Sequence, residues 1–206
     1  MLYLHRWDPK TPLLETFEAL RELQAQGKIR HIGGSNFAAW QVMKAQAVAE
    51  QLGTRIDIIQ PMYSLIKRQA EVELFPMALS EDIAVAPYSP LGSGLLTGKY
   101  QAGGEGRLST DRRYAARYGQ AWMAETAQAL SALAGKWGTD PATLAVAWAA
   151  KHPAVSAPII SGRTAQQLEA SLKALSVFLT AEQYSQIEAL SARPAPATDR
   201  LEEAGA

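Results

Sequence analysis

The chain alternates short apolar runs rich in β-branched residues with longer segments of helical periodicity, and this alternation constrains its fold more than any other feature. Such a pattern is typical of parallel βα units, whose strands are buried on both faces by the helices between them. Strands are predicted at Leu2–His5, Ile29–Gly33, Ile56–Gln60, Ile83–Tyr88 and Ala157–Ile160. The sequence therefore predicts an α/β fold with five parallel strands.

The segments between and after these strands predict helices. In the first of them, Leu14, Phe17, Leu20 and Leu23 recur at three-residue steps and form one apolar face that ends before Gly27. The predicted helices are Leu13–Gln26, Ala38–Leu52, Val72–Leu79, Ala121–Trp137, Pro141–Lys151, Ala165–Leu175 and a last helix from the N-cap Thr180 to Leu190.

Two segments lack this periodicity. Residues 92–119 are rich in Gly and Arg and predict a long loop after the fourth strand, and long loops in compact domains often carry function. Residues 193–206 are rich in Pro and Ala and then acidic, so this tail buries little and is expected to be flexible. One domain is therefore expected over residues 1–192, which suffice for a single core.

Composition excludes several classes of function. The 20 Lys and Arg residues balance 20 Asp and Glu residues, and no dense basic run offers a surface for nucleic acid. The absence of Cys excludes disulfides, thiolate nucleophiles and Cys-based zinc sites, and the scattered His31 and His152 make no metal site. The first residues resemble neither a signal peptide nor a membrane anchor, so a cytoplasmic location without a membrane partner is expected.

A doubly wound sheet with a dinucleotide-binding turn is one architecture for such a pattern. It usually carries a G-x-G-x-x-G turn after its first strand, but none follows Leu4, and Gly92-Ser93-Gly94 is not followed by a third glycine and a helix. Five βα units are too few for an eight-stranded barrel, which typically needs about 250 residues. Part of such a barrel nevertheless suits the pattern.

Four motifs lie where predicted strands end. They are LYLHRWDP at residues 2–9, GKIRHIGGSNF at 27–37, PYSPLGSGLLTGK at 87–99 and SGRT at 161–164, which is followed by Gln167. In this order and strand context they resemble the ends of the fourth, fifth, seventh and eighth strands of the aldo-keto reductase barrel. The resemblance runs from Leu2 to about Leu190 and implies a partial (β/α)8 TIM barrel with about the last five βα units.

The resemblance also implies an NADP-dependent oxidoreductase that reduces a small aldehyde or ketone to an alcohol. His5 would be its catalytic residue here and would donate a hydrogen bond to the substrate carbonyl, at the carboxyl end of a strand where barrel active sites gather. Without the resemblance, a lone histidine in an apolar run would be interpreted as a core or rim residue.

The resemblance further assigns residues to the nicotinamide half of the cofactor. Ser35, Asn36 and Gln60 would hold the carboxamide of the ring, and Tyr88 would stack against the ring itself. From the residue types alone, Ser35 and Asn36 indicate a turn, and Tyr88 indicates an amphipathic aromatic at a strand end.

The remaining cofactor residues would bind phosphates and adenosine. A segment that offers small residues and free backbone amides, suited to a pyrophosphate, comprises Ser89, Pro90, Leu91, Gly92, Ser93 and Gly94. Lys99 would neutralise phosphate charge. Ser161, Gly162 and Arg163 lie near a predicted helix N-terminus, and Arg163 favours NADP over NAD. Gln167 resembles the family's adenine contact, and Ser171 stands where many members carry Asn.

The family's other catalytic residues, an aspartate, a tyrosine and a lysine, lie on segments before the strand that starts this chain. Tyr3 lacks the family's tyrosine motif, and a positioned general acid contributes about 10²- to 10⁴-fold to rate. The chain alone is therefore expected to be inactive, as a truncated product in which Met1 is an internal methionine. Open strand edges would favour self-association. The alternative is a non-catalytic NADP-binding or interaction protein on the same fold.

Overall fold

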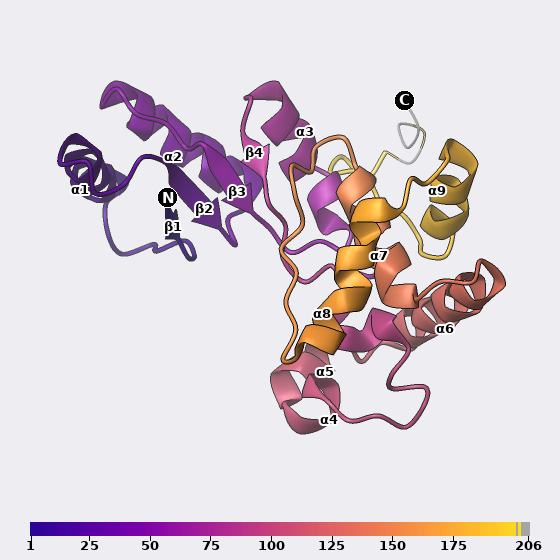
Figure 1. Cartoon of the computed structure of the whole chain (residues 1–206). Helices are drawn as coiled ribbons and strands as arrows, with labels where there is room; N and C mark the ends of the chain where they lie inside the picture. The colour runs from indigo at the N-terminus through magenta and orange to yellow at the C-terminus, as the bar shows by residue number, and fades with distance from the viewer. Residues whose placement is uncertain (201, 203–206) are drawn as a thin grey trace.

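The computed structural model describes residues 1–200 and 202 and contains a four-stranded parallel sheet whose strands lie in chain order (Figure 1). The strands are β1 (Leu2–Leu4), β2 (Ile32–Ser35), β3 (Ile58–Gln60) and β4 (Ala84–Val85). Tyr3 lies opposite Gly33, and Ile58 pairs with Gly33 on one side and Ala84 on the other. The predicted parallel α/β class is confirmed, and the strand order is consistent with part of a barrel.

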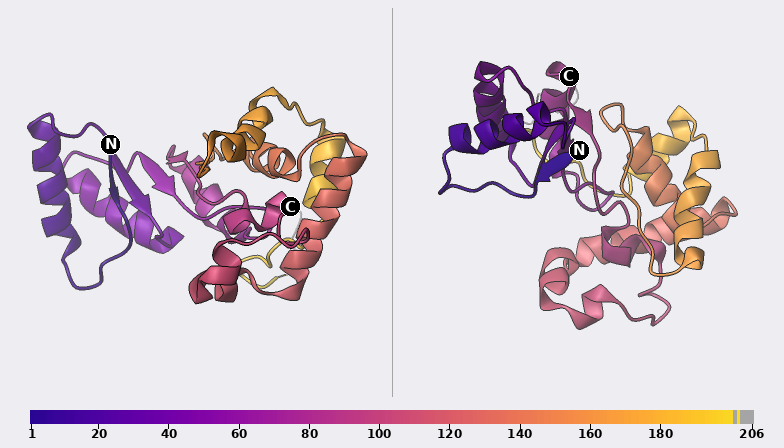
Figure 2. Two further views of the ribbon diagram at one scale, coloured as in Figure 1. Left: turned by 60° about the horizontal axis from the view of Figure 1, so that its bottom comes forward. Right: turned by 60° about the vertical axis from the view of Figure 1, so that its left-hand side comes forward.

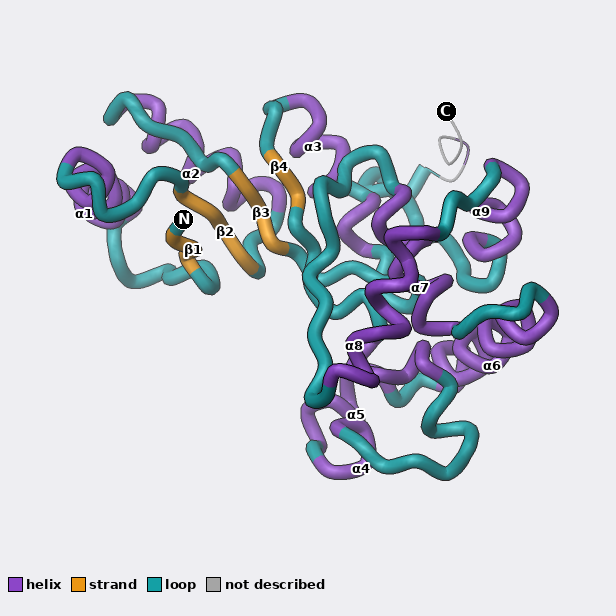
Figure 3. The backbone as a smooth tube through the Cα atoms, viewed as in Figure 1, coloured by secondary structure: helices purple, strands orange, loops and turns teal. Residues whose placement is uncertain are grey.

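Helices connect and follow the strands and dominate the C-terminal half (Figure 3). The α-helices are α1 (Leu13–Ala25), α2 (Ala39–Gln51), α3 (Leu74–Ser80), α4 (Arg107–Thr110), α5 (Arg112–Tyr118), α6 (Ala121–Lys136), α7 (Pro141–Lys151), α8 (Ala165–Leu172) and α9 (Ala181–Glu188), with 3-10 turns η1 (Gln69–Glu71), η2 (Gly92–Thr97) and η3 (Lys173–Ser176). Every predicted helix is present, most within two residues of its predicted bounds. α9 begins after Thr180, whose hydroxyl accepts from the Gln183 amide as an N-cap.

The second strand lies further along the chain than predicted. The expected range was Ile29–Gly33, whereas the strand spans Ile32–Ser35 and all four of its residues are buried. Gly33 was expected to end the strand, but it lies within it. The Tyr3 ring lies over Gly33, where a Cβ would collide with the ring.

The predicted fifth strand, Ala157–Ile160, is wrong as a strand of this sheet. Its backbone lies beside the end of β4, where the amide of Ile159 donates to the carbonyl of Pro87 at 2.8 Å and an isolated parallel bridge joins Ile159 to Tyr88. Pro158 has no amide hydrogen to donate, so the hydrogen-bond ladder cannot continue through it.

The prediction of a long loop over residues 92–119 is also wrong in part, because η2, α4 and α5 occupy much of it. The two helices have only four and seven residues, too few for a helical period to show in the sequence. Asp111 caps α5 by accepting from the amide of Arg113 at 2.9 Å. Tyr118, at the end of α5, is 2% exposed and packs in the core.

The hydrophobic core is continuous from the strands to the C-terminal helices, which gather beyond β4 on the side away from α1 (Figure 2). Phe17 of α1 and Val42 of α2 are completely buried. On the other side of β4, the buried Trp148 ring stacks with Tyr63 and Tyr184 at centroid distances of 5.2 and 5.9 Å. These rings join α7 and α9 to the segment that follows β3.

Some apolar surface remains uncovered. In the part of the chain that the structure describes, β1 pairs with β2 alone, and Met1 and Leu2 beside its free edge are exposed. Leu175 and Phe178 are 80% and 90% exposed. None of the described helices is both long and apolar enough to cross a membrane.

The C-terminal tail starts with contacts to the core. Arg193 lies 3.5 Å from a carboxylate oxygen of Glu188 and 3.9 Å from one of Glu71. The flexibility predicted for residues 193–206 stays a prediction, since positions 201 and 203–206 lie outside the described residues.

A buried arginine joins the segment after β3 to the C-terminal end of the fold. The Arg68 guanidinium donates to both carboxylate oxygens of Glu71, at 2.9 and 2.8 Å, to Glu188 at 2.8 Å and to the carbonyl of Ser191 at 3.2 Å. It also lies 5.4 Å from the Trp148 ring. Burial lowers the pKa of Arg68, but the two carboxylates outweigh it and raise that pKa. The guanidinium therefore stays charged and paired.

We expect Arg68→Ala to lower the free energy of unfolding by about 3–5 kcal/mol, because it removes the buried cation and its two hydrogen bonds from the Glu71 carboxylate. Urea denaturation followed by circular dichroism measures the change. The matched control is Arg113→Ala, which removes a solvent-exposed arginine paired with Asp111 and should leave the midpoint unchanged. A loss below about 1 kcal/mol for Arg68→Ala would contradict a stabilising role for this cluster.

Candidate functional site

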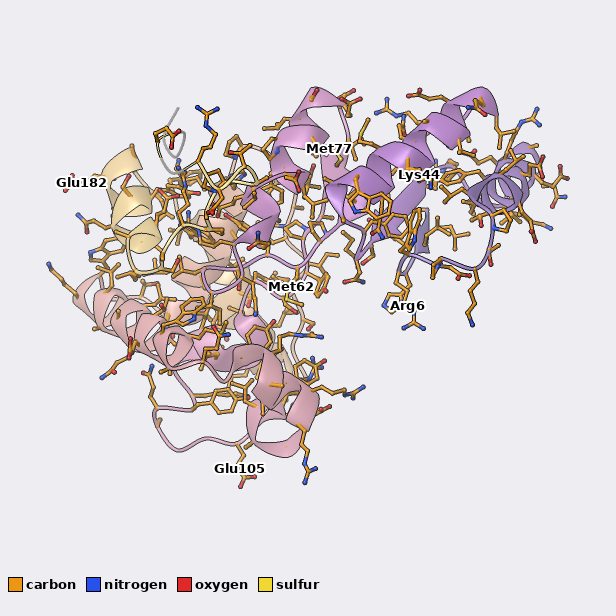
Figure 4. All side chains as sticks on the ribbon, turned by 180° about the vertical axis from the view of Figure 1, so that it is seen from behind. Arg6, Lys44, Met62, Met77, Glu105 and Glu182 are labelled. Atoms are coloured by element: carbon orange, nitrogen blue, oxygen red, sulfur yellow. The ribbon has the colours of Figure 1, made fainter. Side chains whose placement is uncertain are left out.

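The residues predicted for the site lie where the parallel strands end. His5 follows β1, Ser35 is the last residue of β2, Gln60 is the last residue of β3, and Tyr88 lies three residues beyond β4. Because the strands are parallel and paired in register, these ends meet at one edge of the sheet, marked in Figure 4 by Arg6 beside His5 and by Met62 beyond β3. We call this edge the mouth.

Hydrogen bonds through Asn36 connect three strand ends at the mouth. The Asn36 amide nitrogen donates to the carbonyl of His5 at 2.8 Å and to the Ser35 hydroxyl at 3.0 Å. The Tyr88 hydroxyl donates to the Asn36 amide oxygen at 2.6 Å. Asn36 has a φ of 57°, a left-handed conformation that asparagine tolerates better than most residues and that directs its side chain along this edge. The Ser35 hydroxyl donates to the carbonyl of Gln60 at 2.9 Å.

His5 and Tyr3 lie two residues apart and so project to the same face of the sheet. The His5 side chain is exposed, whereas the Tyr3 ring is half-buried over Gly33. Burial raises the pKa of Tyr3, and a hydrogen bond with Gln60 opposes this only in part. Tyr3 therefore stays neutral, two residues before His5 in the sequence.

The segment from Ser89 to Gly94 is a tight turn with several left-handed residues. Ser89, Gly92, Ser93 and Gly94 have φ values of 60°, 53°, 56° and 89°. The amide of Gly92 donates to Ser89 and that of Gly94 donates to Leu91, both at 2.9 Å, so the expectation of free amides is wrong for these two residues. Pro90 and Leu91 are the two central residues of the turn between Ser89 and Gly92.

Two side chains bring polar atoms to this turn. The Lys99 side chain lies against Gly94, and its ammonium lies 4.7 Å from the Tyr100 ring. The Ser93 hydroxyl is buried and has no hydrogen bond of good geometry among the described residues. The Tyr118 hydroxyl lies close to Ser93 and also donates to the Met62 sulfur at 3.5 Å. Sequence reasoning missed Tyr118 and Met62, because no local pattern shows that α5 folds back onto the end of β3.

The last predicted group follows the bridge between Ile159 and Tyr88 and leads into α8. Ser161, Gly162 and Arg163 are exposed, and no ion pair involves Arg163 within the described chain. The Gln167 side chain accepts from the amide of Arg163 at 3.0 Å, and the Thr164 hydroxyl caps the helix by accepting from the Gln167 amide at 3.2 Å.

Ser171 is not brought to the mouth with the other residues. It is 1% exposed, and its hydroxyl has no hydrogen-bond partner among the described residues. The neighbouring carbonyl of Ala170 accepts from Thr143 of α7 at 2.6 Å, so this face of α8 is packed against α7. A contact between Ser171 and a ligand would require α8 to move away from α7.

A cavity of about 310 Å³ lies at the opposite end of the strands. Its lining includes Asp57, just before β3, and Ala84, the first residue of β4, so it opens at the amino ends of the sheet. Barrel enzymes bind ligands at the carboxyl ends. Among the described residues there is also no cluster of side chains suited to a metal ion.

Comparison with known proteins gives matches along nearly the whole chain. A family model described as "Aldo/keto reductase family" matches residues 1–192. An uncharacterized oxidoreductase, YrpG, of Bacillus subtilis is 35% identical over 87% of this chain and 54% of its own length. Versiconal hemiacetal acetate reductase of Aspergillus parasiticus is 31% identical over 91% of this chain and 56% of its own. A probable voltage-gated potassium channel subunit beta of Oryza sativa is 33% identical over 92% and 61%.

The chain thus spans about half the length of these curated relatives. These relatives include named oxidoreductases, and the family model covers every strand of the sheet and all residues of the mouth. The fold, the strand-end motifs and the family match lead to one conclusion: the chain belongs to the aldo/keto reductase family.

Proposed function

We propose that residues 1–192 are the cofactor-binding part of an NADP-dependent oxidoreductase that reduces small aldehydes or ketones to alcohols. The observation that carries the proposal is the convergence of His5, Asn36 and Tyr88 at the mouth through the hydrogen bonds of Asn36. The family match and the relatives named as reductases support the same chemistry. A second polypeptide segment or a second copy would cover the free edge of β1.

The residues at the mouth fit a nicotinamide dinucleotide with a 2′-phosphate. The exposed Arg163 has no carboxylate partner among the described residues, and its guanidinium would bind the 2′-phosphate in two hydrogen bonds. The turn at 89–94, with the buried Ser93 hydroxyl lacking a good partner and Lys99 alongside, suits a pyrophosphate.

When bound, this cofactor supplies the hydride. In the proposed mechanism, Asn36 would hold the ring carboxamide together with Ser35 and Gln60. Tyr88, whose hydroxyl is anchored on Asn36, would stack against the nicotinamide. The His5 ring donates a hydrogen bond to the carbonyl oxygen of the substrate and so stabilises the negative charge that develops there.

A second candidate function is cofactor binding without catalysis. The neutral Tyr3 is half-buried and lies two residues before His5. The 206-residue sequence contains no match to the family's tyrosine motif. The relative named as a potassium channel subunit suggests an interaction role as the alternative. An upstream in-frame coding sequence with the family's Asp, Tyr and Lys motifs would favour the enzyme, and a stop codon there would favour the second candidate.

We expect the 206-residue chain by itself to reduce an aromatic aldehyde at least about 10²-fold more slowly than a chimera in which the N-terminal segment of a family member precedes residue 1, because a positioned general acid contributes that much. Oxidation of NADPH followed at 340 nm measures both rates. Equal rates for the two proteins would show that these residues hold the complete catalytic machinery.

The Arg163→Ala variant should bind NADP about 10- to 100-fold more weakly and leave the affinity for NAD unchanged, because a charge-assisted pair of hydrogen bonds to the 2′-phosphate is lost. Calorimetric titration of the chain with both nucleotides measures this. Arg21→Ala, which removes an exposed arginine of α1, is the control. Equal affinity for NADP and NAD in all three proteins would rule out the assignment of Arg163.

In the chimera, His5→Ala should lower turnover about 10²- to 10³-fold while NADP affinity stays within about twofold, because His5 acts on the carbonyl in the transition state and not on the cofactor. Steady-state kinetics and a nucleotide titration separate the two effects. A variant with near-normal turnover would leave His5 only a structural role.

A further inference from the structure

Two cationic side chains outside the family motifs lie near the mouth. Lys67 belongs to the tight turn after β3, where its amide donates to the Ser64 carbonyl at 2.9 Å, and Arg117 lies in the last turn of α5. Within the described chain, neither side chain forms an ion pair with a carboxylate. The sequence keeps them 50 positions apart, and only the fold brings them together.

Aromatic rings hold these two cations. The Lys67 ammonium lies 5.6 Å from the centre of the Tyr118 ring, and the Arg117 guanidinium lies 5.6 Å from that of Tyr114. Tyr118 and Tyr114 are both on α5, so the short helix places the two cations on one side of the mouth. Cations over tyrosine faces gain a modest electrostatic attraction and lose freedom of movement.

The charges are close enough to act on each other. Burial lowers the pKa of Lys67, and the positive charge of Arg117 lowers it further. Arg117 also opposes the effect of burial on the pKa values of Tyr88 and Tyr118. The two cations, the end of β4 and the turn that starts at Ser89 therefore share one electrostatic environment.

This arrangement carries an uncompensated repulsion. Lysine and arginine on a surface ordinarily extend into water or pair with carboxylates. Lys67 instead lies half-buried with a like charge nearby, and the buried Ser93 hydroxyl close to Tyr118 also lacks a good hydrogen-bond partner. An oxyanion between these groups would offset the repulsion and accept a hydrogen bond from Ser93.

We propose that Lys67 and Arg117, together with the Ser93 hydroxyl, form an oxyanion site at the mouth, distinct from the 161–164 segment, for a phosphoryl or carboxylate group. The group comes either from the pyrophosphate of the cofactor or from an anionic carbonyl substrate. The source of the group rests on the proposed function. The binding of inorganic pyrophosphate at this site does not.

The test follows the titration of Lys67 in the complete 206-residue chain labelled with ¹³C-lysine, with the Cε resonance assigned by Lys67→Gln. Inorganic pyrophosphate should raise the pKa of Lys67, because its negative charge counters that of Arg117 and stabilises the protonated amine. Arg117→Gln should raise the pKa of Lys67 before any ligand is added and weaken pyrophosphate binding about tenfold. Arg117→Lys should restore most of the affinity.

Arg21→Gln, which removes one exposed positive charge from α1, is the matched control and should change neither quantity. An intact circular dichroism spectrum for Arg117→Gln shows that the variant is folded. Unchanged pyrophosphate affinity in this folded variant, or a pKa of Lys67 that does not respond to pyrophosphate, would overturn the proposal.

Two further arms identify the source of the oxyanion. A rise in the pKa of Lys67 with NADP that persists in Arg163→Ala would support the cofactor pyrophosphate. A rise only with 4-carboxybenzaldehyde, and not with benzaldehyde, would support an anionic substrate. If the chain binds pyrophosphate at Lys67 but binds neither NADP nor NAD, the oxyanion site is supported and the proposed function is contradicted. Failure of the oxyanion site and failure of the proposed function are therefore distinguishable.

Discussion

The buried guanidinium of Arg68 fixes the relation between the two halves of this fold. It binds Glu71 within its own segment and Glu188 at the end of α9, so residues far apart in the chain meet at one charged group. Its position over Trp148 adds the aromatic stack of Tyr63 to the same junction. Because Arg68 directly follows Lys67, this pairing also sets where the turn after β3 presents its lysine to the mouth.

The packing of Tyr3 in the sheet depends on Gly33, which has no side chain. Gly33 leaves room for the Tyr3 ring against β2, and this phenol stays neutral two residues before the exposed His5. Asn36 then closes the edge with hydrogen bonds to the ends of β1 and β4. The result is a polar rim on an apolar sheet, and a mostly apolar surface with a few placed polar groups is typical of ligand-binding sites.

Positive charge without carboxylate partners gathers around this rim. Lys99 lies beside Gly94, Arg163 precedes α8, and Lys67 and Arg117 lie over the rings of Tyr118 and Tyr114. A chain with zero formal net charge has acidic residues available for pairing, and Arg68 and Arg113 use them. Among the described residues the cations near the mouth have no such acidic partner, so they remain available to an anionic ligand.

The sequence by itself determined the α/β class, the helices and the strand-end residues, because periodicity and helix caps are local properties. α7 has the predicted bounds, Gln60 ends β3 as predicted, and His5 directly follows β1. The predicted fourth strand, Ile83–Tyr88, is shorter in the structure, because β4 ends at Val85, three residues before Tyr88. The tertiary structure alone decided that β2 starts at Ile32, where its pairing with β1 starts. It also decided that Pro158 interrupts the fifth strand, that Ser171 is buried against α7, and that burial and the charge of Arg117 lower the pKa of Lys67. Each of these depends on a contact between distant segments, which no local pattern encodes.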